Sequence, residues 1–408
     1  MLGADMGISE GLSHKIWLAV AIGGLIALLG LGVRSTFGLF LAPMSADLGW
    51  GREVFALAIA TQNLMWGLSQ PVAGMIADRF GTARVLALGG LLYGLGIYGM
   101  AQASSPSMLY MTGGLLVGLG MSGASFPLVL AALGRMVPER RRTLAFGITT
   151  AAGSLGQFLL VPLGQQFLVV YGWPTALVLL ALLVALVIPL ATAMRGRGQE
   201  SAGVAKQSMG QALREAGRHS GYLYLTAGFF VCGFHVSFIG THMPAYVTDR
   251  GLSAEIGAWS LATVGLFNVL GAILAGILGN RFQKKILLSL IYLARAVIIT
   301  VFIMLPISPA TVLLFSAAIG LTWLSTVPLT SAIVAQIFGP RYMATLFGFV
   351  FLSHQFGSFL GVWLGGYMFD RSGSYDVVWW LGVALGLFAA LVHLPINERP
   401  VARLAAAE

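Results

Sequence analysis

The sequence predicts an all-α membrane protein with twelve transmembrane helices, arranged as two six-helix bundles that are related by pseudo-symmetry. Three observations lead to this class. Of the 408 residues, 58% are hydrophobic and only 9% are charged, whereas soluble domains carry about 25% charged residues. Apolar segments long enough to cross a bilayer recur along the whole chain. Residue patterns of the first half also return in the second half, about 201–202 residues later.

Twelve apolar segments are predicted to span the bilayer as helices. They cover about residues 15–42, 53–77, 85–103, 107–134, 143–168, 174–194, 220–244, 256–279, 286–305, 310–338, 343–368 and 377–395. Residues 1–14 are polar or small, and the first apolar stretch is too long for a signal peptide, so we expect it to be retained as the first span. Cys232, the single cysteine, has no partner in the chain, which excludes an intrachain disulfide and a cysteine-based zinc site.

Basic residues lie almost entirely on one side of the predicted spans. Of the 23 Lys and Arg residues, 18 fall in loops or tails on the side of the N-terminus, Arg52, Arg250 and Arg371 fall on the other side, and Arg34 and Arg295 lie inside spans. By the positive-inside rule, we expect a multi-pass protein of the inner membrane with both termini in the cytoplasm. The net charge of +9 is therefore explained by the orientation of the chain in the lipid bilayer, and no nucleic-acid partner is needed to account for it.

The longest polar stretch divides the predicted spans into six and six. We interpret residues 195–219 as a cytoplasmic linker between one bundle at 1–194 and another at 220–408. Patterns of the first bundle return in the second: for example, Gly74-Met-Ile-Ala-Asp78-Arg79-Phe80 returns as Gly276-Ile-Leu-Gly-Asn280-Arg281-Phe282, and Ser125-Phe-Pro127-Leu128 returns as Thr326-Val-Pro328-Leu329. Two such repeats, related about an axis along the membrane normal, are the plan of a secondary transporter whose substrate binds between them near the midplane.

Arg34 lies inside an apolar run, Ile16 to Leu41, and is therefore expected at membrane depth. A guanidinium there costs about 2.5–3.5 kcal/mol, so such residues face an internal cavity or a partner. The same predicted helix contains no acidic residue. Arg34 therefore indicates a binding site for an anion that crosses the membrane, and the alternative is a role as a gate only.

Amide, aromatic and hydroxyl side chains at membrane depth predict further contacts with the substrate. Hydrogen-bonding groups between aromatic walls orient a small polar ligand in a pocket, although the same groups also bond neighbouring helices to each other. The candidates are Gln62, Asn63, Trp66, Gln157, Asn268, Trp323 and Ser325.

One loop carries a family resemblance. The segment Gly74-x-x-x-Asp78-Arg79-Phe80-Gly81-x-x-Arg84 resembles the loop 2–3 signature of the major facilitator superfamily, and with the twelve spans and the second copy at Gly276 the resemblance covers the whole chain. It implies the major facilitator fold. It also implies that Asp78, Arg79 and Arg84 belong to a cytoplasmic charge network that latches one conformation, so we predict a gating role for them and for Arg281 in the second copy.

A narrower similarity is to the monocarboxylate-transporter branch and its bacterial relatives. That branch carries a basic residue in helix 1 at the position of Arg34. Helix 11 lines the cavity in the family, which implies roles in substrate binding for His354 and Gln355. An Asp and an Arg of helix 8 in that branch fall here on Asn268 and Ala272. The charge of an anion would therefore be met mainly by Arg34, with a histidine or Arg295 as further candidates.

The remaining titratable groups expected at membrane depth are histidines, because every Asp and Glu maps to a loop, a tail or a helix end. His235 and His242 share roughly one face of the seventh span, and His354 lies in the eleventh. An ordinary imidazole pKa near 6.5 suits proton coupling, and the alternative is a neutral ring bonded to a neighbouring helix. For Arg295, the alternative to a substrate role is a bond to backbone carbonyls or to a helix end.

Together these patterns predict a secondary transporter, not an enzyme. We expect it to take up a small organic anion, with a monocarboxylate as the favoured substrate, by alternating access with proton symport. The sequence has no phosphate-binding Gly-Lys-Ser/Thr loop, which argues against direct ATP drive, and we expect no cofactor, no metal and a monomer. An exchanger or exporter of a neutral or aromatic compound, and a membrane sensor or scaffold without flux, are the alternatives.

Overall fold

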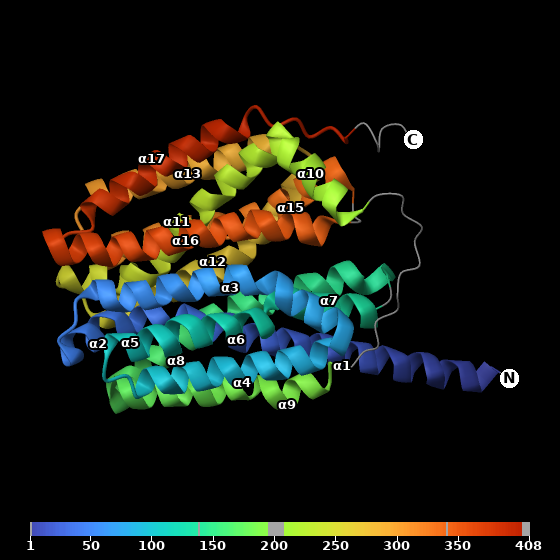
Figure 1. The fold of residues 1–408 in the computed structure, drawn as a ribbon, viewed down its shortest axis with the longest axis horizontal. Helices are drawn as coiled ribbons and strands as arrows, with labels where there is room; N and C mark the ends of the chain where they lie inside the picture. Colours follow the sequence, from blue (N-terminus) through green and yellow to red (C-terminus); the bar gives the residue numbers. More distant parts are fainter. Residues whose placement is uncertain (1, 138, 195–207, 340–341, 402–408) are drawn as a thin grey trace.

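Helices from distant parts of the sequence meet along the centre of the molecule, where α3 lies beside α16 and α8 packs against α12 (Figure 1). The structure is a computed structural model that describes residues 2–137, 139–194, 208–339 and 342–401. Within these ranges the secondary structure is helical and contains no strand. The predicted all-α class is therefore confirmed, while residues 195–207 of the predicted linker lie outside the described ranges.

The N-terminal half, as used below, comprises α1 to α9. Its elements are α1 (Leu2–Ser35), the 3₁₀ helix η1 (Phe37–Phe40), α2 (Leu41–Leu48), α3 (Arg52–Phe80), α4 (Thr82–Ala101), α5 (Pro106–Leu109), the π-helix η2 (Tyr110–Leu116), α6 (Val117–Gly123), α7 (Phe126–Met136), α8 (Glu139–Ala185) and α9 (Val187–Thr192).

The C-terminal half comprises α11 to α17 and follows a short amphipathic helix, α10 (Met209–Arg218). Its elements are α11 (Ser220–Asp249), α12 (Ala254–Gly279), α13 (Lys284–Met304), α14 (Pro309–Thr322), α15 (Thr326–Phe338), α16 (Met343–Ser372) and α17 (Asp376–His393). In Figure 1 the blue-to-green N-terminal half lies below the yellow-to-red C-terminal half.

The described residues contain ten helical segments that are long and apolar enough to cross a membrane. One of these segments holds both predicted spans 143–168 and 174–194, and the chain turns within it at Gly172, whose φ is 75°. Glycine adopts this left-handed conformation without a steric penalty. Helix α3 is not one of these ten segments, but it covers the predicted span 53–77. The segments are thus consistent with the twelve predicted crossings.

Two predicted spans, 107–134 and 310–338, are interrupted in the structure. The first breaks between Gly123 and Phe126, and the second between Thr322 and Thr326. Each break precedes a proline at an equivalent position of the two repeats, Pro127 and Pro328. Proline has no N–H group, and its ring crowds the carbonyl four residues earlier, so a continuous helix is disfavoured there.

Glycines allow the closest helix contacts within each half. A Cβ atom on Gly156 of α8 would lie 2.2 Å from the Leu28 carbonyl oxygen of α1, and one on Gly357 of α16 would lie 1.9 Å from the Phe230 carbonyl oxygen of α11. These helices can touch through their backbones only because the glycines have no side chain. The outward faces instead carry exposed apolar side chains such as Leu95, which suit contact with lipid.

Candidate functional site

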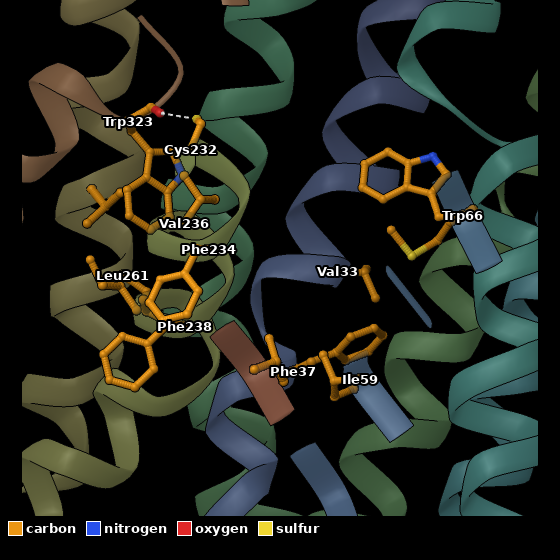
Figure 2. Close-up of a cluster of buried hydrophobic side chains, with 14 of the residues drawn as sticks. Val33, Phe37, Ile59, Trp66, Cys232, Phe234, Val236, Phe238, Leu261 and Trp323 are labelled. Carbon is orange, nitrogen blue, oxygen red and sulfur yellow. Dashed lines mark hydrogen bonds between the residues drawn. The ribbon is translucent and has the colours of Figure 1, made fainter. Parts of the chain in front are cut away.

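A cavity lies between the two halves, and both contribute to its wall. It measures about 750 Å³ when the part open to solvent is included. Figure 2 shows part of its apolar lining, with Phe37 and Ile59 of the N-terminal half on one side and Val236 and Leu261 of the C-terminal half on the other. A substrate site was predicted between the bundles, and the structure has a cavity there.

Arg34 lines this cavity from the end of α1 and is half-buried. Its Nη2 donates a hydrogen bond to the Asn63 side-chain oxygen at 2.8 Å, and its guanidinium lies 5.1 Å from the ring centroid of Trp66. Both partners come from α3 of the same half and neither is acidic. Among the described residues, Arg34 therefore forms no ion pair, so its charge stays available to an anion.

Asn63 connects Arg34 to the C-terminal half. While its side-chain oxygen accepts the bond from Arg34, its backbone carbonyl accepts a bond from Gln355 Nε2 at 3.0 Å. Since Gln355 donates through Nε2, its Oε1 is the acceptor that faces His354 Nδ1 at 3.0 Å. We therefore assign the Nδ1 hydrogen to His354 from this network. Hydrogen bonds thus link His354 in α16 to Arg34 in α1 by way of Gln355 and Asn63, and two separate oxygens of Asn63 accept the bonds from Gln355 and Arg34.

Gln157 and Asn268 form the second contact between the halves at the cavity. Gln157 Nε2 of α8 donates to the Leu261 carbonyl of α12 at 2.8 Å. Asn268 Nδ2 of α12 donates in the opposite direction, to Ser154 Oγ of α8 at 3.0 Å. Both amides line the cavity and also bond the halves together.

The other predicted contact residues occupy two different places. Trp323 lines the main cavity, whereas Trp66 lines an adjoining pocket of about 280 Å³ in the N-terminal half. Ser325 follows Trp323 in the break between α14 and α15, where its Oγ donates to the Leu321 carbonyl at 2.6 Å. Ser325, His354 and Gln355 are buried and do not line either pocket.

The three predicted proton carriers differ in their surroundings. His235 Nε2 lies 2.7 Å from the Gly382 carbonyl oxygen, and His242 Nε2 lies 2.8 Å from the Val362 carbonyl oxygen, both within the C-terminal half. His354 instead stacks on Phe351 and belongs to the chain that reaches Arg34. Geometry therefore favours His354 among the three.

Sequence reasoning missed a charged cluster at one end of the bundle, which we name the Arg52 cluster: Arg52, Glu53, Asp249, Asp370 and Tyr375. Arg52 Nη1 of α3 lies 2.5 Å from Asp249 Oδ2 of α11 and also donates to the Tyr375 hydroxyl at 2.8 Å. The Asp370 carboxylate of α16 accepts the backbone N–H groups of Arg52 and Glu53 at 2.9 and 2.7 Å, so it caps α3 across the two halves. Burial raises the pKa of Tyr375, whose hydroxyl stays protonated.

The Arg52 cluster closes this end of the molecule, because each of these contacts joins the N-terminal half to the C-terminal half. Its one cation, Arg52, was counted for orientation in the sequence, but the acidic partners Asp249 and Asp370 lie 197 and 318 residues away. A pattern search along the chain cannot pair residues at such a separation.

The predicted gating residues lie at the opposite end. Arg79, Arg84 and Arg281 are exposed, and Arg84 Nη1 donates to the carbonyl of Phe80, in the preceding turn, at 3.3 Å. The side chain of Asp78 lies outside the described part of the chain. The gating role of these four residues stays a prediction.

Further cavity-lining residues were not predicted: Phe37, Ser154, Ser237 and Thr241. Ser237 and Thr241 lie one turn apart on α11, on a stretch where only the histidines were considered. Their spacing of four residues on one helix face was the available signal. Among the described residues, no group of three or more His, Cys, Asp or Glu side chains could hold a metal ion.

The helical fold, the two breaks at equivalent positions and the cavity between the halves are those of a membrane transporter. The family model of the Major Facilitator Superfamily matches residues 20–324 and 258–408, and the chain belongs to this superfamily. The resemblance seen in the sequence is thereby confirmed, and the protein is a transporter, not an enzyme.

Several known proteins are similar to the chain along most of its length. Monocarboxylate transporter 13 of Bos taurus is 25% identical, with 88% of this chain and 84% of the relative covered. The oxalate:formate antiporter of Oxalobacter formigenes is 26% identical, with 90% and 88% covered. Among solved structures, the nucleoside transporter NupG superposes with a TM-score of 0.75 at 12% identity, over 93% of this chain and 99% of that one.

Proposed function

We propose that this transporter takes up a small monocarboxylate across the inner membrane by alternating access, with proton symport. The observation that carries the proposal is the placement of Arg34, a cation in the cavity wall that forms no ion pair among the described residues. A carboxylate in the cavity would supply the negative charge and could accept two parallel hydrogen bonds from the guanidinium. Two relatives whose names refer to monocarboxylates, oxalate and formate support an organic anion.

The charge of the cavity supports one carboxylate on the substrate. Arg34 is the single Lys or Arg among the described residues that line the cavity. A dicarboxylate would bring a second negative charge into a low-dielectric site without a cation to pair with it, which is costly. Apolar residues such as Phe37, Ile59 and Leu261 would then contact the remainder of a monoanion.

On the positive-inside rule, we propose that the Arg281 end faces the cytoplasm and the Arg52 cluster the periplasm. The conformation described here would then be closed toward the periplasm. The substrate would enter from that side only after the Arg52 cluster opens, and a cytoplasmic network around Arg79, Arg84 and Arg281 would close the other side. Both chain termini would lie in the cytoplasm.

Proton coupling is proposed to use His354. The chain of hydrogen bonds through Gln355 and Asn63 joins this histidine to the guanidinium that would bind the anion. Symport requires that proton and anion favour the same conformation, because a ligand shifts an equilibrium only through differential affinity. Asn63 bonds Arg34 with its side chain and the C-terminal half with its backbone, so both ligands would act on one contact between the halves.

Uptake of labelled pyruvate, lactate and benzoate into proteoliposomes, with and without an inward proton gradient, tests the function. We expect saturable uptake of at least one acid that the gradient stimulates and an ionophore abolishes. Exchange of internal for external acid without stimulation by the gradient would contradict symport. Absence of flux for all three acids would contradict the proposed substrate class and favour a neutral or aromatic cargo, or a sensor.

The variant His354→Gln is expected to transport without stimulation by a proton gradient, because glutamine can bond Gln355 but cannot take up a proton. His242→Gln is the matched control: its imidazole bonds a backbone carbonyl of α16 and lies outside the chain to Arg34. The ratio of uptake with and without the gradient measures the effect. A ratio that falls in His242→Gln and persists in His354→Gln would assign the proton to the other histidine.

A further inference from the structure

The break between α14 and α15 leaves backbone groups without helical partners inside the C-terminal half. Pro328 has no N–H group, and the helix is interrupted over Trp323, Leu324 and Ser325. The carbonyls of Thr322 and Trp323 therefore need partners outside their own helix, since an unpaired carbonyl at membrane depth costs several kcal/mol.

Arg295 of the neighbouring helix α13 supplies these partners. Its side chain is buried, with 1% of its surface exposed. Nη2 donates to the carbonyls of Thr322 and Trp323, the latter at 2.6 Å. Among the described residues Arg295 forms no ion pair with an acidic side chain. A guanidinium buried at membrane depth thus donates hydrogen bonds to two backbone carbonyls at a helix break.

Asn268 holds the same break from the opposite side. Its Oδ1 accepts the backbone N–H of Leu324 at 3.0 Å, and its Nδ2 donates to Ser154 of the N-terminal half at 3.0 Å. The break is therefore bonded to α13 through Arg295 and to α12 through Asn268. Through Asn268 it is also connected to the contact between the halves.

The broken segment forms part of the cavity wall. Trp323 and Leu324 line the cavity, as does Asn268. Figure 2 shows Trp323 beside Cys232, whose thiol lies 3.9 Å from the Trp323 carbonyl oxygen. A displacement of the two carbonyls that Arg295 bonds would therefore move a wall of the cavity.

We propose that Arg295 is a positioning residue, which fixes the α14–α15 break and thereby sets the place of Trp323 in the cavity wall. Its effect on transport rests on the proposed function of this cavity, whereas its effect on Trp323 does not. The guanidinium suits this task because the two N–H groups of Nη2 are fixed in its plane and donate to the two carbonyls at once. A lysine ammonium is a point charge on a flexible stem and holds them less firmly.

The N-terminal half shows that a break alone does not require a buried cation. At the equivalent break, Gln70 Nε2 donates to Ser125 Oγ at 3.0 Å. Gly94 stands 201 residues before Arg295, at the repeat offset. The cation therefore belongs to the wall that carries Trp323 and is not a general feature of the two repeats.

Fluorine NMR of the full-length protein labelled with 5-fluorotryptophan tests the proposal without any substrate. The Trp323 resonance is assigned by its loss in Trp323→Phe. We expect Arg295→Gln to shift and broaden this resonance, Arg295→Lys to shift it less, and other tryptophan resonances such as that of Trp173 to stay in place. Val297→Ala, at an exposed position of the same helix, is the matched control and should leave Trp323 unchanged.

Uptake kinetics then separate positioning from general stability. Arg295→Lys should raise the KM for pyruvate about tenfold, the effect of losing one charge-assisted hydrogen bond, with a smaller change in maximal rate. In the Trp323→Phe background the same substitution should change KM little, because the side chain through which it acts is gone. If Arg295→Gln does not fold, the Trp323 resonance and the KM of Arg295→Lys alone test the proposal.

An unchanged Trp323 resonance in the folded variants would overturn the proposal, and so would an equal rise of KM in both backgrounds. If pyruvate is not transported at all, the proposed function fails while the NMR result still decides the role of Arg295. The two failures are therefore distinguishable.

Discussion

Replacing Arg34 by glutamine should abolish saturable uptake of labelled pyruvate at concentrations near the wild-type KM. Glutamine can still bond Asn63 but carries no charge to meet a carboxylate. Removing one partner of a buried, hydrogen-bonded charge pair costs about 2–5 kcal/mol, which corresponds to a loss of affinity of roughly thirtyfold or more. Initial uptake rates over a range of substrate concentrations measure this effect.

Arg34→Lys and Arg250→Gln are the controls for this experiment. Lysine keeps the charge but cannot donate two parallel bonds, so partial uptake with a raised KM is expected. Arg250 lies 3.6 Å from Asp376 within the same half and away from the cavity, so its loss should leave KM unchanged. Normal affinity in Arg34→Gln would show that this cation does not bind the substrate.

The second large effect is expected from Arg52→Ala, which should open the end of the cavity at the Arg52 cluster, the end that we propose faces the periplasm. The substitution removes the ion pair with Asp249, the hydrogen bond to Tyr375 and the stacking on Phe369, whose ring centroid lies 3.7 Å from the guanidinium carbon. The ion pair is half-buried, so we assign about 1–2 kcal/mol to the loss. A change of that size shifts a two-state equilibrium by a factor of about 5–30.

Reaction of a single cavity cysteine with a membrane-impermeant thiol reagent measures this shift. Thr241→Cys in a Cys232→Ala background places the thiol in the cavity wall of α11. Labelling from outside intact cells should be several-fold faster when Arg52→Ala is added. Arg250→Ala is the matched control, because its ion pair with Asp376 stays within the C-terminal half. Equal labelling rates with and without Arg52 would contradict a gate at this cluster.

Part of the candidate site followed from residue types alone. Arg34, Gln62, Asn63, Gln157, Asn268 and Trp323 were selected because polar groups at membrane depth need an aqueous cavity or a partner, and all six line the cavity. A polar residue type at membrane depth does not by itself distinguish a residue that lines a cavity from one that bonds a neighbouring helix. Gln355, selected on a resemblance, donates to the Asn63 carbonyl and does not line the cavity.

The Arg52 cluster could not be predicted from residue types. Arg52 was placed next to the predicted span 53–77 and is the first residue of α3, yet its partners Asp249 and Asp370 belong to other helices. Which carboxylate meets which cation depends on how the two halves are packed, and hydropathy contains no information on that packing. For Arg295, a bond to backbone carbonyls was one of the predicted alternatives. The particular carbonyls could not be predicted, because the helix break near Trp323 was not predicted.

Membrane class, helical architecture and the repeat of six spans could all be derived from the order of the residues, because lipid permits few backbone structures and imposes the length and polarity of each span. Three features could not be derived in this way: the pairing of helices across the halves, the closed end at the Arg52 cluster, and the hydrogen bonds that link Arg34, Asn63, Gln355 and His354. These depend on contacts between residues far apart in the chain, which form only when the two bundles pack together.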